Sequence, residues 1–181
     1  MIPSFTISGV LPPFVGSNPA QPSAISPYPT SMSQVVMRFA TTPERRTILE
    51  GLLDYRHALN AIGFNDGYQW LDGSFVEDVE TLEGRPPNDI DVLTVVRRPI
   101  GVNDFATLVA TNINLFDPGL TKRVYRTDGY IVDLEKPPHL LVNDIVYWYG
   151  LFSHKRKTSL WKGMLSVPFD VADDVFARVL L

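Results

Sequence analysis

The chain has 181 residues, of which 45% are hydrophobic and 11% aromatic, and its formal net charge is −4. This length fits one domain with a well-filled core, and the acidic balance excludes a general nucleic-acid binder, which needs a basic face. Without cysteine there are no disulfides and no thiol chemistry. The N-terminal residues do not show the basic region followed by an apolar segment that is typical of a signal peptide, and no apolar run reaches membrane-spanning length. We therefore expect a cytoplasmic protein that does not enter a membrane.

Residues 1–33 are rich in proline and serine, a composition that forms neither a regular helix nor a central strand. The segment is either a disordered arm or an extended wrap over the domain. Its apolar side chains are too frequent for a purely solvated tail, so we predict an extended arm that docks on a domain formed by residues 34–181. The docking side chains would be Phe5, Val10, Leu11, Phe14 and Tyr28.

Helices and strands are predicted from residue 42 onward. Thr42 and Pro43 suit the start of a helix whose apolar stripe continues to Ile62, and Gly63 suits its end. We further predict strands at 68–71, 89–96 and 124–134, helices after Asp104 and Asn143, and a turn at 117–119. This order favours an α/β (α+β) fold, a small mixed β-sheet backed by helices.

Two aspartates, Asp89 and Asp91, stand one residue apart in a strand-like run and so face the same side. Adjacent carboxylates repel, and a divalent cation between them relieves the repulsion. The Gly73-Ser74 turn closes the preceding strand, and such a turn can approach phosphates closely. Alone, the turn could be an ordinary one and Asp89 a solvated strand entry. Asp91 is flanked by apolar neighbours, where an unpaired carboxylate is costly.

Gly73-Ser74 followed by Asp89-Ile90-Asp91 resembles the signature of the nucleotidyltransferase superfamily, which includes DNA polymerase beta and CCA-adding enzymes. Much of the chain is also similar to an uncharacterised bacterial nucleotidyltransferase-like family. The resemblance implies a minimal nucleotidyltransferase core that binds a nucleoside triphosphate such as ATP on Gly73 and Ser74. It also implies one or two Mg²⁺ ions on Asp89, Asp91 and a third carboxylate. The segments similar to the bacterial family are 9–13, 70–77, 85–92 and 147–163.

The third carboxylate has two candidates, Asp128 and Asp133, in the later strand. They are five residues apart and face opposite sides of a regular strand, so at most one reaches the metal. The resemblance favours Asp128. The spacer at 75–88 is slightly longer than the superfamily usually has and is rich in acidic residues. We expect a solvated loop there, with a gate at the substrate entrance as the alternative.

Residues 153–158 form a dense basic run in which Lys155 and Arg156 could contact phosphate or nucleic acid. A solvated helix end explains the run equally well. Lys122 is a further candidate for triphosphate contact. Aromatic residues flank the run and either stack a base or fill the core; they are Tyr147, Trp148, Tyr149 and Trp161. The three histidines show no zinc-ligand spacing.

These patterns lead to two hypotheses. The first is a metal-dependent nucleotidyltransferase that moves a nucleoside monophosphate to an acceptor hydroxyl on a protein, a tRNA or a small molecule. The second is a nucleotidyltransferase-like interaction protein without turnover, for example one partner of a toxin–antitoxin or phage-defence pair. Its contact surfaces would be the proline-rich arm and the aromatic-basic segment.

Overall fold

A five-stranded mixed sheet with the strand order β1-β5-β2-β3-β4 forms the centre of the computed structural model, which describes all 181 residues. β2 runs antiparallel to both of its neighbours, whereas β3 and β4 are parallel, as are β1 and β5. The mixed α/β architecture predicted from the sequence is confirmed. The strands are β1 Tyr28–Pro29, β2 Gly67–Asp72, β3 Ile90–Val96, β4 Thr127–Asp133 and β5 Leu165–Pro168.

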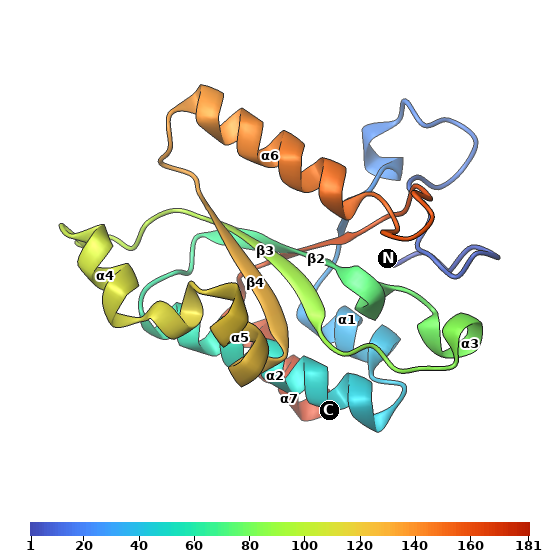
Figure 1. Ribbon diagram of the computed structural model, residues 1–181, viewed down its shortest axis with the longest axis horizontal. Helices are drawn as coiled ribbons and strands as arrows, with labels where there is room; N and C mark the ends of the chain where they lie inside the picture. The colour runs from blue at the N-terminus through green and yellow to red at the C-terminus, as the bar shows by residue number, and fades with distance from the viewer.

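Helices cover both faces of the sheet (Figure 1). α6 lies alone over one face, whereas α1, α2, α5 and α7 gather on the other, where the larger part of the core lies. No helix is both long enough and apolar enough to span a bilayer. The helices are α1 Met32–Phe39, α2 Pro43–Ala61, α3 Val79–Glu83, α4 Phe105–Thr111, α5 Pro118–Tyr125, α6 Pro138–Phe152 and α7 Val171–Leu180.

The α2 helix follows its sequence signals closely. The Thr42 side chain accepts a hydrogen bond from the Arg45 amide, and Pro43 occupies the first turn, where no backbone donor is needed. The helix ends at Ala61, close to the predicted boundary. Capping signals of this kind are local, so they can be read without knowledge of the tertiary fold.

Two predicted boundaries are wrong. The turn expected at 117–119 is the start of α5, because the Asp117 carboxylate accepts a hydrogen bond from the Leu120 amide and so caps a helix. The following strand therefore begins at Thr127 and not at residue 124. α6 begins at Pro138, ahead of the expected Asn143, because proline is well suited to a first helical turn.

The first 33 residues pack against the rest of the chain. Leu11 and Tyr28 are part of the main hydrophobic core, and the Tyr28 hydroxyl donates a 2.7 Å hydrogen bond to the Pro12 carbonyl. Val10 forms an isolated β-bridge with Glu77. Through β1 this segment also supplies one edge of the sheet.

Candidate functional site

Three aspartates stand side by side across the sheet because of its register. Asp72, at the end of β2, pairs with Asp91 on β3, and Asp91 pairs in turn with Asp128 on β4. Residues directly opposite one another on neighbouring strands share a face. This is the face covered by α6, since Trp70 and Leu93, two positions along their strands, belong to the core cluster that includes α6 residues.

Asp89, Asp91 and Asp128 form a carboxylate cluster whose negative charge exceeds the positive charge of the side chains paired with it. Burial raises the pKa of Asp91 to about 6, and the negative charges of Asp89 and Asp128 add to the shift. The Lys122 ammonium lies 2.5 Å from Asp89 Oδ2 and 3.9 Å from Asp128 Oδ2. No cationic side chain lies within ion-pair distance of Asp91, although Lys162 and Arg156 lower its pKa from farther away. Asp91 is therefore the least compensated carboxylate of the cluster.

Asp89, Asp91 and Asp128, the predicted ligands, are brought together, but they do not close on a single point. No group of three or more His, Asp or Glu side chains in the structure is arranged to hold a metal ion. Asp133, the alternative third carboxylate, lies at the far end of β4 and forms a 2.6 Å ion pair with Arg98. The geometry therefore favours Asp128 over Asp133 as a neighbour of Asp91.

The Gly73-Ser74 turn lies directly against the Asp91 carboxylate. Gly73 has a φ of +81°, a left-handed conformation that favours glycine. A Cβ at this position would also collide with Asp91 Oδ2. The missing side chain thus lets the backbone and the carboxylate approach each other. Ser74 follows, half-buried, in the short 3₁₀ helix Gly73–Val76.

Gly73→Ala is expected to destabilise the fold by about 1–3 kcal/mol, from left-handed strain and from the collision with Asp91. Urea unfolding measures the loss. Gly84→Ala is the matched control, because Gly84 also has a positive φ, +63°, but a Cβ there meets nothing within 4 Å. Equal losses in the two variants would show that only the left-handed backbone is strained, and that the position of the Asp91 carboxylate does not require a glycine at residue 73.

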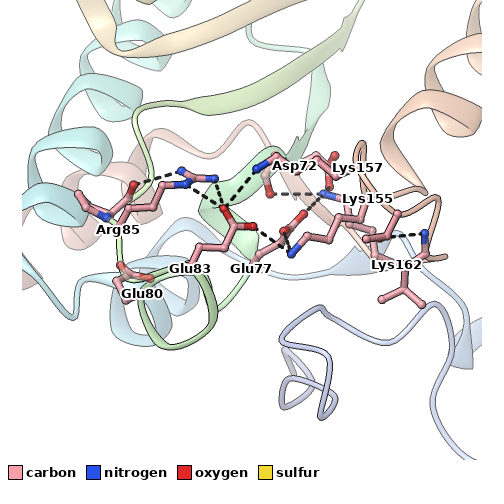
Figure 2. A network of polar contacts seen from close by, with 12 residues as sticks. Asp72, Glu77, Glu80, Glu83, Arg85, Lys155, Lys157 and Lys162 are labelled. Atoms are coloured by element: carbon pink, nitrogen blue, oxygen red, sulfur yellow. Dashed lines mark hydrogen bonds and ion pairs between the residues drawn. The ribbon is translucent and has the colours of Figure 1, made fainter.

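Lys162 is a buried residue of the site that the sequence analysis missed (Figure 2). Only 3% of its side chain is exposed, and Nζ lies 2.8 Å from Glu77 Oε1 and 3.1 Å from Asp72 Oδ1. Nζ also donates a 3.4 Å hydrogen bond to the Gly73 carbonyl. Burial alone would lower the pKa of Lys162, but the two carboxylates raise it, so the side chain remains a cation. Lys162 thereby fixes the turn that contains Gly73.

The basic run and the acidic spacer form ion pairs with each other (Figure 2). Lys155 Nζ lies 3.1 Å from Glu77 Oε2 and 3.4 Å from Glu83 Oε1, so in this structure its charge is paired with the spacer. Arg156 is exposed, and its charge lowers the pKa of Asp91. Of the three basic residues predicted for phosphate contact, Lys122 forms an ion pair with Asp89, and Arg156 acts on Asp91 only through its charge.

The acidic spacer is not the solvated loop that we expected. Arg45 on α2 donates hydrogen bonds to the Phe75 carbonyl at 2.6 Å and to the Glu77 carbonyl at 2.7 Å, and forms an ion pair with Glu80. Residues Val79–Glu83 form the short helix α3. The spacer is thus held by two distant segments, Arg45 of α2 and the lysines of the basic run.

Fold and site together define a mixed α/β protein with a row of carboxylates beside a glycine turn. Residues 3–168 match the family of unknown function DUF6932, and the chain belongs to this family. No curated protein and no solved structure matches the chain. The family description names no reaction, so the resemblance to nucleotidyltransferases stays a prediction.

Proposed function

We propose that this protein is a metal-dependent nucleotidyltransferase that moves a nucleoside monophosphate from a nucleoside triphosphate to an acceptor hydroxyl and releases pyrophosphate. The observation that carries the proposal is the row formed by the Gly73 turn, Asp91 and Asp128 on three neighbouring strand ends. Nucleotidyl transfer needs a triphosphate held in line and its charge neutralised, and it needs little covalent help from the protein.

The donor atoms present fit magnesium. Carboxylate oxygens are hard ligands of the kind that Mg²⁺ prefers, and Asp91 carries a buried charge that Asp89 and Asp128 destabilise. In the proposal these three aspartates would hold one or two ions, and Lys122 would no longer be needed to neutralise Asp89. A bound metal would neutralise charge on the reacting phosphate.

The chain itself contributes binding and proton transfer. The Gly73 backbone and the Ser74 hydroxyl and amide would donate hydrogen bonds to the phosphates. Lys122, once released, and Arg156 would add positive charge. A carboxylate of the cluster would accept the proton of the attacking hydroxyl. The acceptor is a protein, a tRNA or a small molecule, and the fold does not choose among them.

Calorimetric titration tests the proposal. Each of the four ribonucleoside triphosphates is added with Mg²⁺ to the wild type and to the Asp89→Asn/Asp91→Asn variant. We expect magnesium-dependent binding to the wild type that the double variant loses. Asp133→Asn is the control, because Asp133 pairs with Arg98 at the other end of the strand and should leave binding unchanged. A wild type that binds none of the four would overturn the proposal.

The proposed reaction also favours a location in the cytoplasm, where triphosphates and magnesium are abundant.

One observation favours the second candidate, an interaction protein without turnover. The Lys122 ammonium already lies between Asp89 and Asp128, where a metal would otherwise neutralise them. A permanent Lys122 pair would make the site inert, as expected for one partner of a toxin–antitoxin or phage-defence pair. Direct Mn²⁺ titration of Lys122→Gln decides between the two: if metal binds the variant but not the wild type, the lysine has replaced the metal.

A further inference from the structure

A group of exposed and half-exposed aromatic rings adjoins the carboxylate cluster on β4. Tyr130 follows Asp128 by two residues and so lies on the same face of the strand, about 7 Å farther along it. The Trp148 ring of α6 packs on Tyr130 with 4.4 Å between the centroids. Tyr147 meets Trp148 edge-on at 5.2 Å and is 62% exposed. We call Tyr130, Tyr147 and Trp148 the aromatic platform.

The sheet register places the platform beside the carboxylates. Tyr130 pairs with Leu93 on β3, one same-face position beyond the Asp91–Asp128 pair. Tyr147, the outermost ring of the three, is the one most exposed to solvent.

The other two aromatics near the basic run have partners elsewhere. Tyr149 packs edge-on against Trp70 and joins the core cluster under α6. Trp161 lies 6.2 Å from Phe14 of the N-terminal arm. Of the four aromatics considered in the sequence, Tyr147 and Trp148 alone extend the row that begins at Tyr130. Tyr147 therefore has an exposed ring that does not pack into the core as Tyr149 does.

We propose that the aromatic platform binds the base of the nucleoside triphosphate, an inference that rests on the proposed function. The turn after β2 and the carboxylates of β3 and β4 then stand in order across three adjacent strands, and the platform begins at Tyr130, farther along β4. Neighbouring strands are about 4.8 Å apart, so the turn and Asp128 are separated by about two strand spacings. Every base has a flat π-face, so stacking on Tyr147 or Trp148 would bind the four nucleotides with little preference for one base over another.

The test compares MgATP with magnesium inorganic triphosphate, which has the phosphates but no base. Stacking on aromatic side chains is worth about a fivefold to hundredfold gain in affinity per base, so the wild type is expected to bind ATP more tightly by that factor. Tyr147→Ala should remove most of this difference without changing the affinity for triphosphate, whereas Tyr147→Phe should retain it. Phe176→Ala on α7 is the matched control, because Phe176 is similarly exposed, at 55%, on the opposite face of the sheet.

The outcomes separate the inference from the proposed function. If ATP and triphosphate bind the wild type equally, or if Tyr147→Ala leaves ATP affinity unchanged, the platform does not hold the base while the phosphate site stands. If neither ligand binds, the proposed function fails and the inference fails with it. Quenching of tryptophan fluorescence by ATP but not by triphosphate, lost in Trp148→Phe, would support the platform independently of affinity.

Discussion

Replacing Lys162 with methionine is expected to lower the free energy of unfolding by about 3–5 kcal/mol, the largest loss we expect from a single change in this site. Methionine fills a similar volume but leaves Asp72 and Glu77 facing each other without a cation in a region that water does not reach. Asp72 Oδ1 has no hydrogen-bond partner and is held by the charge of Lys162 alone. Urea unfolding at pH 8 measures the loss.

The loss should shrink as the pH is lowered toward 5. Burial raises the pKa of Asp72 to about 7 even with Lys162 present, so the stranded carboxylate takes up a proton on acidification and its uncompensated charge disappears. Lys157→Met is the matched control, because this lysine is 77% exposed and its 3.9 Å pair with Glu83 should be worth less than about 1 kcal/mol. If Lys162→Met is as mild as the control, Lys162 does not hold the turn.

The elements that were predictable have local signals. The cap at Thr42 and the apolar stripe of α2 lie within one stretch of sequence, and so does the strand around Asp91. β5 has only four residues, and β1 only two; each is a strand because it pairs with a distant neighbour. No residue pattern inside such short runs separates a strand from a loop, so the sequence analysis missed both.

The site shows the same division between local and distant information. The shared face of Asp89 and Asp91 follows from strand alternation, and the Gly73 turn follows from the resemblance. Lys162 is different, because its partners Asp72 and Glu77 lie 85 or more residues away in the chain. Asp72 could have been found, since an antiparallel pairing of the two predicted strands places it opposite Asp91. Lys162 has no such signal, because its position depends on β5 joining β2.

Asp91→Asn is expected to stabilise the metal-free protein while it removes any stabilisation by Mg²⁺ and nucleotide. Burial and the charges of Asp89 and Asp128 raise the pKa of Asp91 to about 6. A folded-state pKa above the unfolded value means that the folded protein holds the extra proton, so stability falls as pH rises from about 4 to about 6. The amide avoids this cost, which corresponds to about 1–3 kcal/mol at pH 8.

Thermal unfolding with and without MgATP at pH 8 checks both halves of this prediction. The wild type should have the lower Tm without ligand and should gain on addition of MgATP, as any ligand that binds only the folded state requires. The variant should begin higher and gain nothing. If the variant is less stable than the wild type without ligand, the charge of Asp91 stabilises the fold through contacts within the protein, and no bound cation is needed to explain it. The Tm without ligand and the Tm gain with MgATP together distinguish a carboxylate that serves binding from one that serves structure. A carboxylate that serves structure stabilises the protein without ligand, whereas one that serves binding destabilises it.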